Sequence, residues 1–207
     1  MNFGFLVFDD AEELDFLGPW EMIGVWRKYS GGPEFAFVVS ETGGVVNCAK
    51  GLRILSDYGF ADCPQIDYLL IPGGQGTRRA VTNAKLLEFV RTQAQSCKQV
   101  LSVCTGSFIL QAAGLLNGRR ATTHWGSLDR LRELNDVKVT ETRFVRDGNI
   151  WTAAGVSAGI DLALALIADQ AGEETAGEVQ LYAEYYPNAK RFGTAHLRPE
   201  APSYLKD

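Results

Sequence analysis

One cysteine of this sequence stands where a predicted buried strand meets a predicted helix with almost no loop between them. The strand covers Val100–Val103, and Cys104 is followed by Thr105 and Gly106. A sharp strand-to-helix turn of this kind exposes the side chain at its tip, as in a nucleophile elbow. The helix N-terminus behind the turn favours a thiolate, and its amide N–H groups can stabilise a developing negative charge. Cys104 is therefore a candidate nucleophile, although a buried, inert thiol explains this segment equally well.

A second turn after a predicted strand is rich in glycine. Gly73 and Gly74 follow the apolar run Tyr68–Ile71 directly after Pro72. Glycines allow a tight turn whose N–H groups face a ligand. A plain turn is as good an interpretation of this segment taken alone.

A third turn, after the apolar run Phe3–Phe8, carries acidic residues that include Asp15. We expect Pro19 to occupy the first helical position, which puts the N-cap at Gly18. Asp15 then lies too far upstream to cap the helix. A carboxyl group beside a thiolate would have a raised pKa and could transfer a proton. An acidic surface loop is the more frequent alternative.

The remaining cysteines and histidines give weaker signals. His124 could complete a Cys–His pair, but a packed, hydrogen-bonded role fits its strand-like surroundings better. Cys48, Cys63 and Cys97 lack the junction that marks Cys104, so we expect inert thiols. Without a C-x-x-C pair, and with two histidines in all, we expect no metal site.

Composition limits the classes of partner. The chain has 207 residues, 46 % of them hydrophobic, and a formal net charge of −5. This balance predicts a single globular domain over residues 1–207. Acidic charge disfavours a nucleic-acid partner. We expect a cytoplasmic protein without a membrane partner, because the N-terminus has no basic leader and the apolar stretches are too short to span a bilayer.

The order of elements predicts an α/β fold. Strand-like runs at 3–8, 35–39, 68–71 and 100–103 alternate with helical spacing from residue 19, at 84–94, 107–113, 128–134, 160–168 and 175–185. Hairpins are predicted around 45–56 and 147–148, the second following an alternating strand-like run at 137–145. This alternation predicts a mostly parallel sheet with helices on both faces, with sites beyond the carboxyl ends of the strands.

Taken together, the motifs resemble those of the ThiJ/PfpI superfamily over roughly residues 1–185. The segments that carry the resemblance are 15–19 (DFLGP), 72–74 (PGG), 102–107 (SVCTGS), 112–119 (AAGLLNGR), 121–125 (ATTHW) and 155–161 (GVSAGID). The resemblance implies a flavodoxin-like fold related to class I glutamine amidotransferases, with a cysteine at the nucleophile elbow. It also implies a homodimer.

Within that superfamily the motifs are most similar to the isocyanide hydratase branch. The resemblance implies an isocyanide substrate, Cys104 as nucleophile, Asp15 as proton donor, and a further hydrogen bond from the Thr105 hydroxyl. N–H groups around Gly73 and Gly74 would position substrate and water. The substrate pocket would include Phe16, Trp20, His124 and Trp125, and no cofactor is implied.

Two alternatives stay open. One is another cysteine-dependent enzyme of this fold, a hydrolase or glyoxalase with His124 as base; the other is a non-enzymatic sensor whose Cys104 is oxidised. Thr105 occupies the position where the protease-like branch has histidine, and Asp15 the position where the deglycase branch has glutamate. A branch fused to an AraC-type DNA-binding module is not expected, since 207 residues leave no room for it.

Overall fold

A computed structural model describes residues 1–134, 136–187 and 191–205 of the chain. Its centre is a six-stranded sheet in the order β2-β1-β5-β6-β10-β9. All neighbouring pairs are parallel except β10 with β9, which is antiparallel. The predicted mostly parallel sheet is confirmed. The strands are β1 (Asn2–Leu6), β2 (Phe35–Val39), β5 (Tyr68–Ile71), β6 (Gln99–Val103), β9 (Phe144–Asp147) and β10 (Ile150–Ala153).

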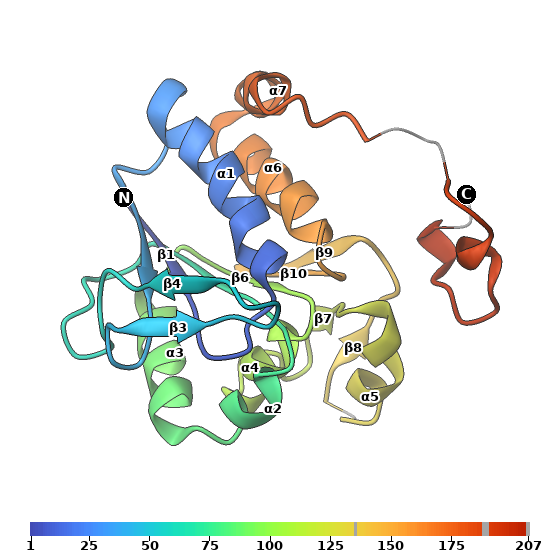
Figure 1. The fold of residues 1–207 in the computed structure, drawn as a ribbon, viewed down its shortest axis with the longest axis horizontal. Coiled ribbons are helices and arrows are strands. Elements are labelled where there is room, and N and C mark those ends of the chain that lie inside the picture. The colour runs from blue at the N-terminus through green and yellow to red at the C-terminus, as the bar shows by residue number, and fades with distance from the viewer. Residues whose placement is uncertain (135, 188–190, 206–207) are drawn as a thin grey trace.

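Helices cover both faces of this sheet, as the sequence predicts (Figure 1). One face carries α1 (Glu13–Tyr29), α6 (Ala158–Ala171) and α7 (Glu173–Tyr182), and the other carries α2 (Thr77–Ala80), α3 (Ala84–Ser96) and α4 (Gly106–Ala112). Each layer encloses its own hydrophobic core, so the strands between them are buried on both sides. The four-residue helix α2 was not predicted, because so short a segment shows no helical periodicity.

Smaller elements surround the sheet. The predicted first hairpin is present as β3 (Val45–Asn47) and β4 (Arg53–Leu55). The single strand predicted over 137–145 is wrong, because β8 (Lys138–Val139) pairs with β7 (Arg120–Ala121) in a separate two-stranded sheet while β9 joins the central one. The other elements are α5 (Leu128–Arg132) and the 3-10 helices η1 (Trp125–Ser127), η2 (Ala195–Leu197) and η3 (Ser203–Leu205).

The first helix begins earlier than predicted. It starts at Glu13 with Glu12 at the N-cap, so Pro19 lies inside the helix and Gly18 is not the cap. A proline in this position frees the carbonyl oxygen of Asp15, four residues before it. Gly159 of α6 packs at this point, where a Cβ would lie 2.9 Å from Pro19 Cγ and 3.2 Å from that oxygen. Helix α6 thus packs closely on α1 at the point where Pro19 interrupts the helical hydrogen bonds. Asp15 lies in the first turn of α1.

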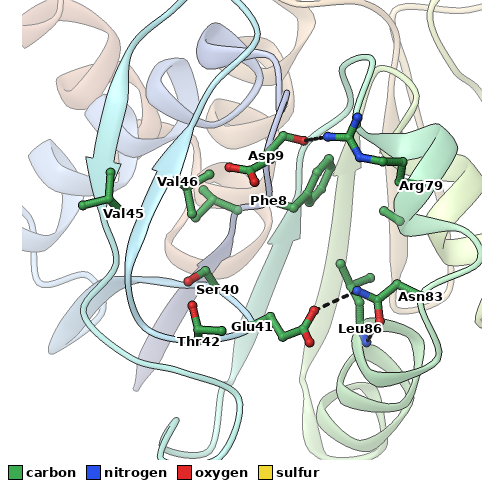
Figure 2. A pocket seen from close by; sticks show the side chains of 13 residues that line it. Phe8, Asp9, Ser40, Glu41, Thr42, Val45, Val46, Arg79, Asn83 and Leu86 are labelled. Atoms are coloured by element: carbon green, nitrogen blue, oxygen red, sulfur yellow. Dashed lines mark hydrogen bonds between the residues drawn. The ribbon is translucent and has the colours of Figure 1, made fainter.

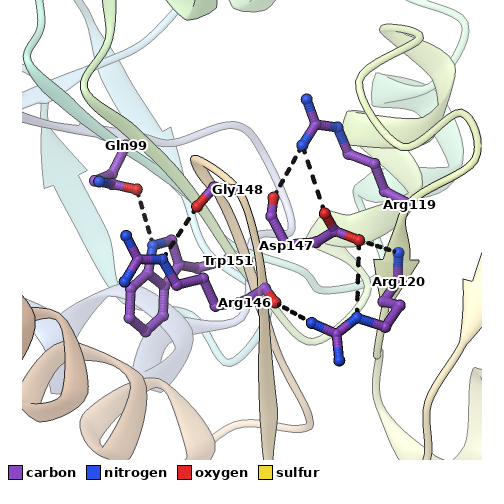
Figure 3. Close-up of polar contacts among 7 residues, drawn as sticks. All are labelled: Gln99, Arg119, Arg120, Arg146, Asp147, Gly148 and Trp151. Atoms are coloured by element: carbon purple, nitrogen blue, oxygen red, sulfur yellow. Dashed lines mark hydrogen bonds and ion pairs between the residues drawn. The ribbon is translucent and has the colours of Figure 1, made fainter.

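The predicted turn at Asp147-Gly148 joins β9 to β10, and Asp147 and the Gly148 carbonyl form several polar contacts there (Figure 3). Asp147 Oδ2 accepts a hydrogen bond from the Arg120 N–H at 2.8 Å, and the Asp147 carbonyl accepts one from Arg119 Nη1 at 2.9 Å. The buried Trp151 donates from Nε1 to Gln99 Oε1 at 2.9 Å. The Asp147 contacts thus tie the β9–β10 turn to the segment of β7, and the Trp151 bond ties β10 to β6.

Candidate active site around Cys104

Cys104 sits at a strained junction between β6 and α4. Its φ of 57° is rare for a residue with a side chain. The Cys104 N–H donates to the carbonyls of Ala153 and Ala154, at 3.1 and 2.9 Å, and its own carbonyl accepts from Thr123 Oγ1 at 2.9 Å. At Gly106 a Cβ would lie 2.4 Å from the Ile71 carbonyl oxygen, so glycine alone allows α4 to begin so close to β5. The predicted sharp turn is present, and the Cys104 side chain is only 7 % exposed.

Asp15 lies beside this thiol, and its carboxyl group is completely buried. Asp15 Oδ2 accepts a hydrogen bond from the Gly73 N–H at 2.8 Å. Asp15 Oδ1 has no partner with hydrogen-bond geometry, while the Cys104 thiol is close enough to interact with the carboxyl group. The interpretation of Asp15 as part of an exposed acidic loop is therefore wrong.

Burial controls the electrostatics of this pair. It raises the pKa of Asp15 to about 8, against the opposing effect of the Gly73 hydrogen bond. Burial also raises the pKa of the Cys104 thiol to about 12, and a negative charge on Asp15 adds to that shift. Free thiolate, expected from the helix N-terminus, is therefore disfavoured while Asp15 is charged. When Asp15 is protonated this repulsion disappears, and the thiolate forms more easily.

The two glycines of the second turn are bonded to the other two turns. Gly74 N–H donates to Thr105 Oγ1 at 3.0 Å, as Gly73 N–H does to Asp15. Thr77 Oγ1 donates to the Gly74 carbonyl at 2.8 Å. A Cβ on Gly73 would lie 2.5 Å from Thr105 N and 2.9 Å from Asp15 Oδ2. Both predicted N–H donors are thus engaged with side chains, and the turn acts as the contact between Asp15 and the elbow.

Other N–H groups face the sulfur, and one of them belongs to a residue that sequence reasoning missed. The backbone N–H groups of Thr105 and Val156 both interact with the Cys104 thiol and lower its pKa, against the effect of burial. Val156 has a φ of 50°, a strained value for a β-branched residue. The only signal in the sequence was its place in the 155–161 motif.

His124 is near the elbow, but its side-chain hydrogen bond goes to Gly126 and not to the thiol. His124 Nδ1 accepts from the Gly126 N–H at 3.1 Å, and the imidazole packs on Gly155, where a Cβ would lie 2.4 Å from His124 Cδ2. Burial lowers the pKa of His124, which favours the neutral imidazole. The arrangement matches the packed, hydrogen-bonded interpretation rather than a Cys–His pair.

The predicted aromatic residues are distributed differently. Phe16 is fully buried in the core, and Trp20 packs against Phe5 of β1 with ring centroids 5.1 Å apart. Trp125, by contrast, is 41 % exposed next to His124. The structure therefore groups Trp125 and His124, whereas Phe16 and Trp20 support the sheet side of α1.

The other three cysteines are away from any comparable junction. Cys97 lies just before β6, at the opposite end of that strand from Cys104, and its Sγ donates to the Ile66 carbonyl at 3.1 Å. Burial raises the pKa of Cys97 and Cys63 to about 12 and that of Cys48 to about 11. None of the three has the positive φ found at Cys104.

A cavity of about 400 Å³ with both polar and apolar walls lies beyond the carboxyl ends of β1 and β2 (Figure 2). Arg79 donates to the Asp9 carbonyl at its rim, and Asn83 Nδ2 donates to Glu41 Oε2 at 2.8 Å. None of the sequence-predicted site residues lines it. Elsewhere, within the described ranges, no cluster of three or more His, Cys, Asp or Glu side chains could hold a metal ion. No helix in those ranges is long and apolar enough to cross a membrane.

Comparison with known proteins agrees with the geometry. The model of the DJ-1/PfpI family matches residues 2–169. The chain belongs to this family. It is 39 % identical to an isonitrile hydratase from Pseudomonas putida, over 90 % of this chain and 79 % of that one. A ThiJ/PfpI family protein from Pseudomonas syringae has the same fold, with a TM-score of 0.86 and 34 % identity over 99 % of this chain and 82 % of that one.

Family members differ in function, however. The chain is also 34 % identical to an HTH-type transcriptional regulator, CdhR, from Pseudomonas aeruginosa, over 86 % of this chain but only 53 % of the regulator. Membership in the family establishes the fold and leaves the reaction to be argued from the site.

Proposed function

We propose that this DJ-1/PfpI family member is an isocyanide hydratase, which adds water to R–N≡C to give R–NH–CHO. The observation that carries the proposal is a buried carboxyl group with a pKa of about 8 next to the elbow thiol. Near neutral pH such a group can both donate and accept a proton. The resemblance to an isonitrile hydratase supports the same reaction.

The first half of the reaction forms a covalent intermediate. Cys104 Sγ, as thiolate, forms a bond with the terminal carbon of the isocyanide. The Asp15 carboxyl group delivers its proton to that carbon, and the product is a thioimidate, R–N=CH–S–Cys104. The N–H groups of Thr105 and Val156 stabilise the sulfur when it carries negative charge.

The second half returns both groups to their starting states. The Asp15 carboxylate accepts a proton from water as the water oxygen adds to the thioimidate carbon. The Asp15 carboxyl group then delivers that proton to the nitrogen. As the C–S bond breaks, the hydroxyl proton of the tetrahedral intermediate passes to the Asp15 carboxylate, so the N-substituted formamide is released and the thiolate and the protonated carboxyl group are restored. The Gly73 N–H bond holds one carboxyl oxygen, which leaves Asp15 Oδ1 to carry the proton.

Isocyanide consumption and formamide formation by the purified protein test this function. We expect turnover by the unmodified protein and its loss in Cys104→Ala. Asp15→Asn should slow turnover by about a hundredfold or more, since it removes the proton donor. Cys97→Ala is the matched control for a buried thiol outside the elbow and should retain activity.

Absence of turnover by the unmodified protein would refute the proposal for the isocyanides tested. Methylglyoxal conversion would then favour the glyoxalase alternative, and oxidation of Cys104 without any turnover would favour the sensor. If Asp15→Asn is fully active and Cys104→Ala is inactive, the role of Cys104 as nucleophile would stand and that of Asp15 as proton donor would be rejected.

The remaining expectations from the resemblance are proposals of the same kind. We propose that no cofactor takes part, because the thiol and the carboxyl group supply every step. A homodimer and a substrate pocket that includes Trp125 and His124 also stay proposals.

A further inference from the structure

A small cavity lies behind the elbow, between helices α2, α4 and α5. Its volume is about 260 Å³, and it is lined by Thr77, Arg78, Val81, Phe108, Arg130 and Leu134. Of these residues, only Thr77 belongs to the network around Gly74. The walls are mostly apolar; the polar side chains are those of Thr77 and of the two arginines, which come from α2 and α5. This cavity is independent of the proposed function.

The arginines bring uncompensated positive charge to this cavity. Arg130 lies over the Phe108 ring, with Cζ 3.9 Å from the ring centroid, and its Nε is buried without a hydrogen-bond partner. Burial lowers the pKa of Arg130, and the nearby positive charge of Arg78 lowers it further, because the two guanidinium groups repel each other. Among residues 1–134, 136–187 and 191–205, no carboxylate pairs with either; Asp129, on the same helix as Arg130, pairs with Arg132.

An anion bound between the two arginines would account for both observations. Buried polar groups are rarely left without a partner, and like charges are held together only when something offsets their repulsion. A guanidinium group presents paired N–H donors that match a carboxylate. Val81, Phe108 and Leu134 favour a ligand that also carries an apolar group over a bare inorganic ion.

We propose that this cavity binds a small organic carboxylate, with its charge between Arg78 and Arg130 and its apolar part against Phe108, Val81 and Leu134. The cavity is smaller than the usual range for drug-sized ligands, of about 300–1,000 Å³, which limits the ligand to a few carbon atoms or one ring.

Benzoate is a suitable probe, with benzamide as its uncharged analogue and inorganic phosphate as an anion without an apolar part. Titrations followed by backbone amide NMR should show saturable benzoate binding, with the largest shifts at Thr77, Phe108 and Leu134. Benzamide and phosphate should each bind at least about tenfold more weakly. Arg130→Gln and Arg78→Gln should each weaken benzoate binding by about tenfold or more.

Arg53→Gln is the matched control, because Arg53 is an exposed arginine on β4 outside the cavity. Its affinity for benzoate should equal that of the unmodified protein. If Arg130→Gln fails to fold, Arg78→Gln decides the test, since Arg78 is exposed. No saturation by benzoate, or equal affinity in Arg78→Gln, would overturn the proposal. Tighter binding of phosphate than of benzoate would overturn the assigned ligand class.

Discussion

Two turns at the ends of neighbouring strands use their polar groups in opposite ways. At the elbow after β6, a buried carboxyl oxygen has no partner, and both Cys104 and Val156 adopt positive φ. At the turn between β9 and β10, Asp147 is bonded to two arginines, and Gly148 supplies the positive φ without strain (Figure 3). Strain and unsatisfied polar groups cost stability and collect where they serve chemistry. The comparison supports the proposal that the elbow is the functional turn.

The largest expected difference between the two turns is in how stability depends on pH. Asp15 has a folded-state pKa of about 8, above its ordinary value of 3.8. Between these two pH values the carboxyl group is protonated in the folded state and ionised in the unfolded state. The free energy of unfolding should fall by about 1.4 kcal/mol per pH unit from pH 5 to pH 8 from this group alone. Asp15→Asn should remove that slope, as measured by urea unfolding at several pH values.

Asp147→Asn serves as the control from the other turn. Its stability curve should run parallel to that of the unmodified protein over the same pH range. Parallel curves for Asp15→Asn as well would show that the buried carboxyl group does not carry the expected proton.

The next largest effect is expected at Gly73, which links Asp15 to the elbow. Alanine here would place a Cβ 2.5 Å from Thr105 N. We expect a loss of about 2–3 kcal/mol in unfolding free energy, together with loss of isocyanide turnover. Gly24→Ala is the control within α1, because a Cβ there meets nothing within 4 Å. An active, fully stable Gly73→Ala variant would contradict the role of this contact.

A smaller effect is expected at the base of β10. Gln99→Met keeps the length of the side chain but removes the acceptor for Trp151 Nε1. Leaving that buried N–H without a partner should cost about 1–2 kcal/mol in unfolding free energy. Turnover per folded molecule should not change, because this bond lies far along the strand from Cys104. Reduced turnover at full stability would remove the distinction between the two turns.

The smallest effect is expected for Asp147→Ala. Its ion pairs with Arg119 and Arg120 are partly exposed to solvent, and such pairs contribute about 0–1 kcal/mol. The loss in unfolding free energy should be below about 1 kcal/mol and should shrink as salt is added. Thermal unfolding at low and high salt measures it. A larger, salt-independent loss would show that this turn also depends on burial.

Predictions from the sequence were confirmed for elements whose conformation depends on residues that are close together in the sequence. The strands at 35–39 and 68–71, the hairpins and the sharp turn at Cys104 follow from local apolar runs and from glycine, and all are present. Prediction failed at the start of α1, because a helix can pass through Pro19 when another helix packs against it. It also failed over 137–145, where one alternating run is divided between two sheets.

The sequence by itself determined which residue types stand at the carboxyl ends of β1, β5 and β6, and hence that a thiol, a carboxyl group and a glycine turn meet at one edge. Only the tertiary structure decided their chemistry. Burial of Asp15 raises its pKa, and the Val156 N–H approaches the sulfur of Cys104. Arg78 and Arg130 are 52 residues apart in the sequence but line the same cavity. Desolvation and long-range approach depend on the whole packed chain, so no local pattern encodes them.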